Sequence, residues 1–217
     1  MSVAIDDGIV AILRGVRPER VVRVAEWCCR HGIRAIEVPL NSPEPFDSIA
    51  RLAGAALPGC AIGAGTVLGV DDVLRVRDAG AQFIVSPNVD AAVIRAALRL
   101  GMAALPGFAT AGEAFTAIAA GATRLKLFPA SSYGPDHLKA LRAVLPPAVR
   151  VFPVGGIRAA DCARWLAAGA AGFGFGSELF RPDDDDAQLE RRIGQVMHAY
   201  RTALGISAGV IQTSAAE

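Results

Sequence analysis

The chain has 217 residues, of which 53% are hydrophobic and 20% are charged. Its 22 Lys and Arg residues against 21 Asp and Glu give a formal net charge of +1, which supplies no field for gathering nucleic acid or an anionic membrane surface. No apolar run approaches the roughly 18 residues of a membrane span. The length suits one α/β domain, and a small-molecule function is favoured.

The N-terminus and the cysteines both predict a cytoplasmic protein. The first residues, MSVAIDDGIVAILRG, carry two acids where a secretory signal carries positive charge, and Arg14 interrupts their apolar stretch. The four cysteines form neither a Cys-x-x-Cys pair nor the dense spacing of a secreted disulfide scaffold. We therefore expect no export and reduced thiols.

Short apolar strings recur along the chain, separated by segments rich in Ala and Arg at helical spacing. The strings are IVAIL, AIEVPL, CAIGAG, QFIVSP, MAALPG, RLKLFP, VRVFPVG and AGFGFG. Many of the intervening segments end in a glycine suited to a helix C-cap; these glycines are Gly32, Gly80, Gly101, Gly121 and Gly169. Eight such units predict an α/β fold with parallel strands, a single-domain (β/α)8 TIM barrel.

An open doubly wound sheet is the alternative fold. The chain has no Gly-x-Gly-x-x-Gly after the first strand, which argues against a dinucleotide-binding version of that sheet. We expect residues 1–203 to form the barrel domain, with a last amphipathic helix that runs to about Tyr200. The four acids at 183–186 favour a solvated helix start over a metal site, and residues 204–217 are expected to be a flexible tail.

The catalytic groups of such a barrel lie at the C-terminal ends of its strands, where the loops converge. The residues found at these ends are Arg14, Glu37, Thr66, Ser86 to Asn88, Pro106, Gly107, Lys126, Gly155, Gly156, Gly176 and Ser177.

Lys126 is the candidate nucleophile. Strand alternation in RLKLFP places its two leucine neighbours on the opposite face. At the ordinary lysine pKa only about one amine in 2,500 is neutral at pH 7, but burial and a nearby cation such as Arg14 lower the pKa. The alternative is a structural ion pair with a carboxylate. Lys139, the second of the two lysines, falls on a predicted helix that starts at Pro135 and Asp136, where a solvated surface role is expected.

Glu37 is the candidate general acid and base, because it alternates with Ile36 and Val38 in AIEVPL and condensation of an amine with a carbonyl group requires proton transfers. The alternative is a salt-bridge partner for Arg14 or Lys126. The three histidines, at positions 31, 137 and 198, are expected to be surface or packing residues, and their spacing suggests no zinc site.

Two small-residue pairs follow the last two predicted strands. Gly155 with Gly156, and Gly176 with Ser177, occupy the position where many barrels hold phosphate on backbone N–H groups. Either pair alone also fits an ordinary tight turn. Both together, on adjacent strands, predict a phosphate site.

Six strings in chain order strongly resemble the 2-keto-3-deoxy-6-phosphogluconate and phosphogalactonate aldolase family, over about residues 8–203. They are AILRG (11–15), EVPLNSP (37–43), IGAGTVL (62–68), SPN (86–88), LKLFPAS (125–131) and VGGI (154–157). The resemblance implies a Schiff base on Lys126 and proton transfer by Glu37. It further implies contacts from Arg14 and Thr66 to the keto acid end, and a phosphate held by Gly155, Gly156, Gly176 and Ser177.

Several positions resemble the phosphogalactonate branch of this family. The strings EVPLNSP and SPN and the residue Val154 stand where phosphogluconate enzymes typically have glutamate-valine-threonine-leucine-arginine-threonine, serine-proline-glycine and threonine. Val154 is therefore a candidate specificity residue. Phe108, where a small residue is common, and the extension after Ala203 are departures that bear on substrate range. The family resemblance also implies a homotrimer.

We therefore expect a class I aldolase without metal or organic cofactor that cleaves 2-dehydro-3-deoxy-6-phosphogalactonate to pyruvate and D-glyceraldehyde 3-phosphate in galactonate catabolism. The alternatives within the family are 2-dehydro-3-deoxy-6-phosphogluconate and 4-hydroxy-2-oxoglutarate aldolases. More distant ones are a phosphosugar isomerase or epimerase and a non-catalytic phosphosugar-binding module. The expected partners are these small molecules, not nucleic acid or membrane.

Overall fold

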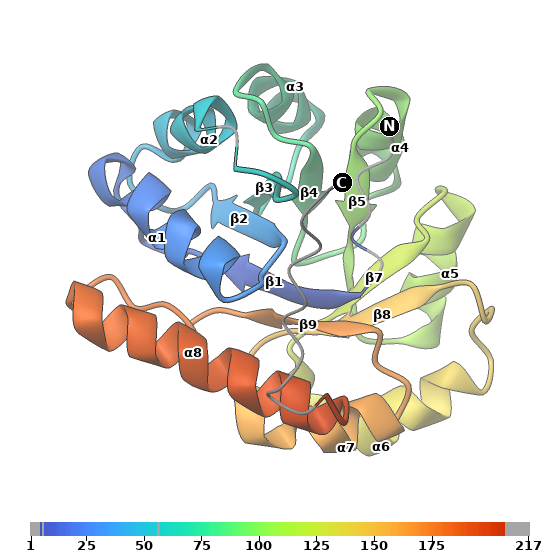
Figure 1. Ribbon diagram of the computed structural model, residues 1–217. Coiled ribbons are helices and arrows are strands. Elements are labelled where there is room, and N and C mark those ends of the chain that lie inside the picture. Colours follow the sequence, from blue (N-terminus) through green and yellow to red (C-terminus); the bar gives the residue numbers. More distant parts are fainter. Residues whose placement is uncertain (1–4, 6, 56, 207–217) are drawn as a thin grey trace, which may run out of the picture.

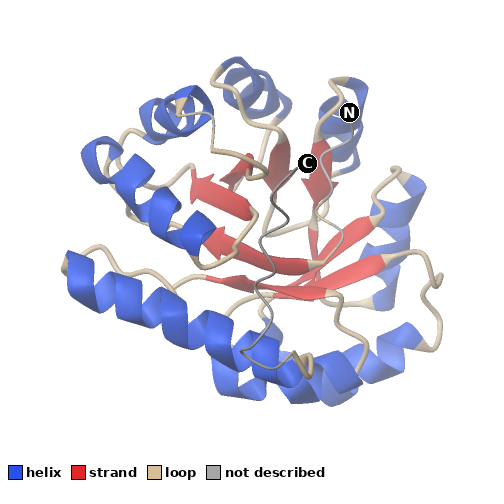
Figure 2. Ribbon diagram, in the orientation of Figure 1, coloured by secondary structure: helices blue, strands red, loops and turns tan. Residues whose placement is uncertain are grey.

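The computed structural model describes residues 5, 7–55 and 57–206, in which parallel strands are surrounded by helices (Figures 1 and 2). The strands are β1 (Gly8–Ile12), β2 (Ala35–Pro39), β3 (Ala61–Gly65), β4 (Phe83–Val85), β5 (Ala103–Leu105), β6 (Gly107–Phe108), β7 (Arg124–Leu127), β8 (Arg150–Pro153) and β9 (Gly172–Phe175). The helices are α1 (Pro18–Arg30), α2 (Pro45–Gly54), α3 (Val70–Asp78), α4 (Ala91–Arg99), α5 (Ala111–Ala119), α6 (Ala130–Arg142), α7 (Cys162–Ala167) and α8 (Asp186–Ala203), with a 3-10 turn at Ala159–Asp161.

The strands form two parallel sheets, in the orders β5-β4-β3-β2-β1-β9 and β6-β7-β8. Every predicted string lies on a strand, but the fifth forms two, β5 and β6. They are separated by Pro106, which has no N–H to give to a ladder. Its carbonyl still accepts a hydrogen bond from the Lys126 N–H at 2.9 Å. The predicted α/β class with parallel strands is confirmed.

Backbone contacts also connect β8 with β9, which belong to different sheets. The N–H of Ala171 donates to the carbonyl of Val151 at 2.8 Å, and Val154 forms an isolated parallel bridge with Gly174. These contacts join the two sheets at one junction of the curled arrangement of strands in Figure 1.

The buried apolar residues form two clusters. The larger one lies between strands and helices, while the smaller one includes Ile5, Val10, Phe83 and Phe152, all at most 3% exposed. Ala35 belongs to the smaller cluster, and Glu37 follows two residues later on the same face of β2. Apolar side chains thus fill the interior near the start of this strand, and a carboxylate occupies its end.

The predicted glycine C-caps are confirmed, since all five glycines have φ between 74° and 103°, a range that favours glycine. The acidic run is confirmed as a helix start: Asp185 caps α8, exchanging hydrogen bonds of 2.8 and 2.9 Å with Gln188. That helix continues beyond the predicted end to Ala203. Residues 204–206 are exposed, and the rest of the predicted tail, 207–217, lies outside the described residues.

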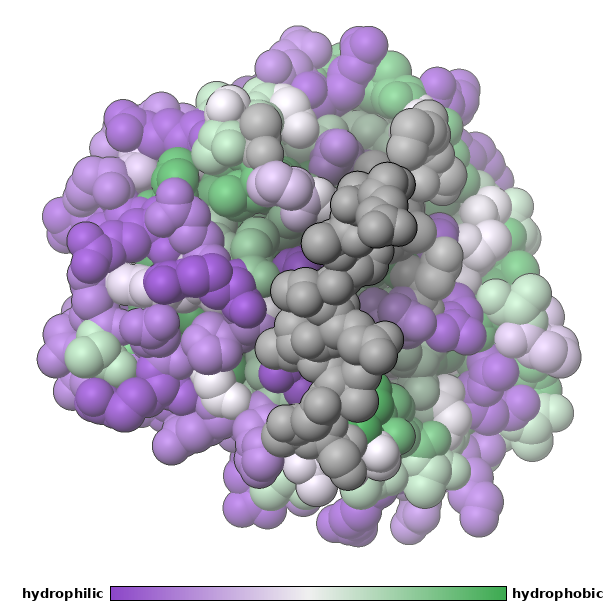
Figure 3. Space-filling model, in the orientation of Figure 1, coloured by the Kyte–Doolittle hydropathy of each residue, from purple (hydrophilic) through white to green (hydrophobic). Residues whose placement is uncertain are grey.

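The first and last helices of the described chain pack together. Helix α8 lies beside α1 (Figure 1), and hydrophilic residues predominate over the outer helices at the left of Figure 3.

Lys139 is exposed on α6, as predicted, and the four cysteines are free. Within the described residues no helix is long and apolar enough to cross a membrane, and no three His, Cys, Asp or Glu side chains gather into a possible metal site.

Candidate active site

Lys126 lies near the end of β7 and is only 6% exposed. Leu125 and Leu127 are fully buried in the outer core, so alternation directs the lysine to the other face, as predicted. Its ammonium nitrogen lies 4.6 Å from the centre of the Phe128 ring. Burial lowers the pKa of Lys126 below its ordinary value; Glu37 opposes this shift, and the positive charge of Arg14 adds to it.

Glu37 lies on β2 and is 2% exposed. Burial raises its pKa from 4.5 to about 7, although the charges of Lys126 and Arg14 both act to lower it. No ion pair within 4.0 Å joins Glu37 to either cation in the described part of the chain. Nor does any described group form a hydrogen bond with its buried Oε2. The carboxyl group is therefore poised between its two protonation states near neutral pH.

The structure explains why β3 ends in a glycine at this point. Gly65 pairs with Pro39 of β2, and a Cβ on Gly65 would collide with Oε2 of Glu37. Because Gly65 has only a hydrogen atom where other residues have a side chain, the Glu37 carboxylate can occupy this space. Gly65 is thus a positioning residue that the sequence argument missed, although it lies within the string IGAGTVL.

Thr66 follows directly and has a φ of 57°, in a region that β-branched residues rarely adopt. Val67, the next residue, fixes the chain there through two hydrogen bonds. Its carbonyl accepts from Ser86 Oγ at 2.7 Å, and its N–H donates to the carbonyl of Val85 at 3.2 Å. Such strain persists where the surroundings impose it and is common at functional sites. Thr66 thus follows directly after Gly65, the residue that adjoins the Glu37 carboxylate.

A cavity of about 890 Å³ opens over Lys126. Seven of the nine predicted site residues line it: Lys126, Arg14, Val154, Gly155, Gly156, Gly176 and Ser177. Glu37 and Thr66 do not line it. Glu37 is buried and interacts with Lys126 and Arg14 through its charge, and no contact places Thr66 at the cavity.

The predicted phosphate-binding turns lie on one side of this cavity. Gly155 and Gly156 have φ of 94° and 71°, so both need the freedom of glycine. Among the described residues, no hydrogen bond uses the backbone N–H of Gly156, Gly176 or Ser177. Free N–H groups in such turns are suited to an anion.

Sequence reasoning missed several residues of the cavity. Phe128 faces the lysine and is two residues beyond it, so strand alternation alone could have identified it. Arg158 and Arg181 lie in loops, where no periodicity predicts direction. Asn41 does not line the cavity, but it accepts a hydrogen bond from the guanidinium of Arg14, which does. The two residues are 27 positions apart, so the sequence alone does not show this contact.

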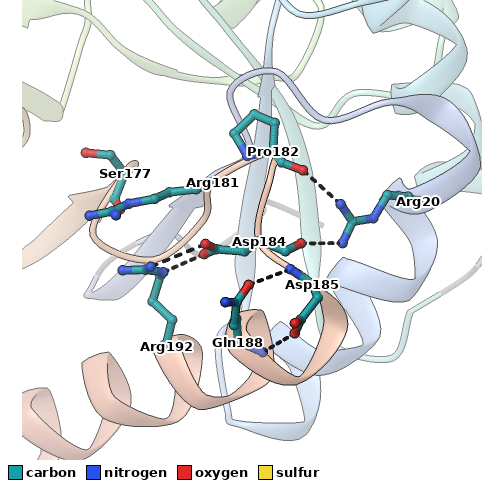
Figure 4. A network of polar contacts seen from close by, with 8 residues as sticks. All are labelled: Arg20, Ser177, Arg181, Pro182, Asp184, Asp185, Gln188 and Arg192. Atoms are coloured by element: carbon teal, nitrogen blue, oxygen red, sulfur yellow. Dashed lines mark hydrogen bonds and ion pairs between the residues drawn. The ribbon is translucent and has the colours of Figure 1, made fainter.

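A polar network fixes the loop that carries Ser177 (Figure 4). Arg20 of α1 donates to the carbonyls of Pro182 and Asp184 at 2.9 and 3.0 Å, and Asp184 pairs with Arg192 of α8 at 2.7 Å. The Nε of Arg181 donates to the carbonyl of Ser177 at 3.1 Å. The cavity wall after β9 is thereby held to both terminal helices.

Comparison with known proteins identifies the family of the chain. Residues 3–196 match the family described as "Aldolase: KDPG and KHG aldolase". A relative from Escherichia coli (strain K12), named "2-dehydro-3-deoxy-6-phosphogalactonate aldolase", is 43% identical over 196 residues, or 90% of this chain and 96% of the relative. A buried lysine in an anion-suited cavity, a buried glutamate that interacts with it through its charge, and this match together define an aldehyde-lyase. The chain belongs to the KDPG and KHG aldolase family.

Two solved structures are similar throughout. One, described as "Native KDPGal structure", has a TM-score of 0.89 and 43% identity, covering 91% of this chain and 96% of its own. The other is a "cube-shaped, highly porous protein cage designed by fusing symmetric oligomeric domains", with a TM-score of 0.89, 42% identity and coverage of 91% and 73%.

Replacing Gly65 with Ala should displace the Glu37 carboxylate and lower aldol cleavage kcat by about 10²-fold, the usual effect of an ångström-scale misplacement. The matched control is Gly54→Ala at the end of α2, where an added Cβ meets nothing within 4 Å. That variant should keep wild-type kcat. Normal turnover by folded Gly65→Ala enzyme would show that the carboxylate position does not matter.

Glu37 should also make the free energy of unfolding depend on pH. Its pKa of about 7 in the folded state lies above the ordinary 4.5, so between these values the folded protein holds a proton that the unfolded chain releases. The free energy of unfolding should therefore fall as pH rises through this window, by on the order of 1 kcal/mol per pH unit. Glu37→Gln should remove that slope in urea titrations from pH 5 to 8. Equal slopes in both proteins would contradict the raised pKa.

Proposed function

We propose that this aldolase is a class I enzyme in which Lys126 forms the Schiff base and Glu37 transfers protons. The observation that carries the proposal is that Lys126 lines the cavity and interacts through its charge with the buried Glu37, with the lysine pKa lowered and the glutamate pKa raised. A neutral amine is a nucleophile, and a carboxyl group that titrates near pH 7 both gives and takes protons. No metal or organic cofactor enters the proposed steps.

The proposed substrate is 2-dehydro-3-deoxy-6-phosphogalactonate. The Lys126 amine attacks its C2 carbonyl, and water leaves with a proton from Glu37 to give an iminium. Glu37, directly or through a water, then takes the C4 hydroxyl proton. The C3–C4 bond breaks, its electrons pass to the iminium, and D-glyceraldehyde 3-phosphate departs. Protonation of the resulting enamine at C3 and hydrolysis of the iminium release pyruvate and restore the lysine.

The other predicted site residues suit the two ends of this substrate. Arg14 and Thr66 are proposed to contact the keto acid end, and Arg14 also raises the cost of a charged Lys126. The phosphate is proposed to bind the turns of Gly155, Gly156, Gly176 and Ser177. Arg158 and Arg181 line the same cavity and add positive charge near this anion.

The choice of substrate rests on the sequence strings EVPLNSP and SPN, on Val154, and on the names of the similar proteins. Val154 lines the cavity immediately before the phosphate turn, where it can contact the sugar backbone. The phosphogluconate epimer and 4-hydroxy-2-oxoglutarate are the competing substrates within the family.

We further propose that the two sheets act as one closed (β/α)8 barrel, supported by the Val154–Gly174 bridge and the bond from Lys126 to Pro106. A homotrimer is proposed from the family resemblance, and the cage built from oligomeric domains that this chain resembles supports self-association. A cytoplasmic location follows from the proposed substrates, which are phosphorylated metabolites.

Proton exchange on pyruvate tests the catalytic pair. Wild-type enzyme in D₂O should replace the methyl protons of pyruvate, followed by NMR, because the enamine forms reversibly. Lys126→Arg should abolish exchange, since guanidinium does not deprotonate, and Glu37→Gln should slow it by about 10² to 10⁴. Lys139→Arg is the matched control and should exchange normally. Exchange by Lys126→Arg would overturn the assignment.

Steady-state rates on the two C4 epimers test the substrate. The galacto epimer should have the higher kcat/KM, and Val154→Thr should narrow the difference because its hydroxyl provides a new hydrogen-bond partner in the cavity. A higher kcat/KM on the gluco epimer would refute the substrate assignment while leaving the Schiff-base chemistry intact.

A further inference from the structure

Arg14 lies in the loop after β1 and is exposed, yet its charge acts on both buried groups of the site. It adds to the lowering of the Lys126 pKa that burial causes, and it opposes the rise that burial causes in the pKa of Glu37. Its side chain also lines the cavity. A long, exposed arginine has many rotamers, so this charge acts from a fixed place only where a partner holds the guanidinium.

That partner is Asn41, in the loop after β2. Nη1 of Arg14 donates a hydrogen bond to Oδ1 of Asn41. Within the described part of the chain the guanidinium has no second hydrogen-bond partner, and no carboxylate lies within the 4.0 Å of an ion pair. The position of the Arg14 guanidinium therefore depends on one neutral amide.

The backbone beside Asn41 is fixed relative to the backbone beside Arg14. The N–H of Ser42 donates to the carbonyl of Pro39 at 2.9 Å, which closes a turn around Asn41. The buried hydroxyl of Ser42 accepts a hydrogen bond from the N–H of Gly15 at 3.0 Å. The loops after β1 and β2 are thus joined next to the contact between the two side chains.

The neutral charge of Asn41 matters as much as its position. An amide oxygen accepts the hydrogen bond without cancelling the charge of the guanidinium, whereas an aspartate in its place would form an ion pair. The positive charge of Arg14 therefore remains available to a carboxylate in the cavity.

We propose that Asn41 is a positioning residue of the aldolase, which holds the Arg14 guanidinium at the cavity and leaves its charge intact for the carboxylate of the keto acid. This inference rests on the proposed role of Arg14 at the keto acid end of the substrate. Asn41 does not line the cavity, so it acts through Arg14.

Pyruvate exchange in D₂O tests the inference on the keto acid end alone, because pyruvate has no other end. Asn41→Leu keeps a similar shape but removes the acceptor, and it should raise the KM for pyruvate by about tenfold. The kcat at each enzyme's own pH optimum should change by less than about threefold. In an Arg14→Gln background, Asn41→Leu should change KM by less than about twofold, because the group that it positions is gone.

Asn41→Asp tests the importance of a neutral partner, because it keeps the acceptor and adds a charge. The acidic limb of kcat/KM for exchange should move to higher pH, since a neutralised Arg14 no longer lowers the pKa of Lys126 or Glu37. Gln195→Glu adds the same charge at an exposed position of α8 and is the matched control; it should keep the wild-type profile. The charged groups around Lys126 are Glu37 and the charged residues of the cavity, which are Arg14, Arg158, Glu178 and Arg181.

Arginine labelling measures the position of Arg14 without any catalysis. Full-length enzyme is treated with limiting phenylglyoxal, and the modified arginines are identified by peptide mass spectrometry. The rate at Arg14 relative to Arg17, an exposed arginine of the same loop, should rise by at least about threefold in Asn41→Leu. The ratio should stay at the wild-type value in Gln195→Glu.

The two assays separate this inference from the proposed function. An unchanged labelling ratio in Asn41→Leu, or an equal effect of Asn41→Leu on KM with and without Arg14, overturns the assignment of Asn41 alone. Faster labelling with a normal KM in both Asn41→Leu and Arg14→Gln overturns the proposed binding role of Arg14, and the inference with it. A wild-type enzyme that does not exchange pyruvate overturns the Schiff-base proposal, while the labelling ratio still decides whether Asn41 holds Arg14.

Discussion

The structure depends on the burial of an amine, that of Lys126, and a carboxyl group, that of Glu37, inside the same fold. Lys126 on β7 and Glu37 on β2 are each shifted by burial toward the neutral form, and Arg14 strengthens the effect on the lysine. Their mutual attraction opposes both shifts but does not bring them into a direct ion pair within the described residues. A tight pair would hold both charges and leave neither group free to react.

The rest of the fold stabilises the buried Lys126 and Glu37 and fixes their positions. Apolar residues such as Phe83 and Phe152 fill the interior near the strand starts, so that water is excluded from one side of the pair. Gly65 leaves room for the carboxylate, and Phe128 faces the amine. The loop held by Arg20 then forms the wall where an anion can bind (Figure 4). The strands carry the two proposed reacting groups, and the loops held by hydrogen bonds form the proposed binding surface.

Local periodicity was sufficient to predict the strands, the parallel α/β class and the directions of Lys126 and Glu37, because alternation is a property of neighbouring residues. It could not predict how far apart the two groups lie, since β2 and β7 belong to different sheets and their separation depends on the curl of the whole structure. The division of one string at Pro106 was missed because the backbone pairs with different neighbours on each side. Arg158 and Arg181 were missed because loop directions follow from tertiary contacts.

The central claim is that Lys126 is the covalent nucleophile, and borohydride trapping measures it most directly. The chain has only two lysines, so the possible amines are Lys126, the exposed Lys139 and the N-terminus. Enzyme treated with pyruvate and borohydride should gain the mass of one reduced pyruvyl group and lose activity in parallel, with the adduct on the peptide containing Leu125, Lys126 and Leu127. An adduct confined to Lys139 or the N-terminus, or full activity after treatment, would contradict the account.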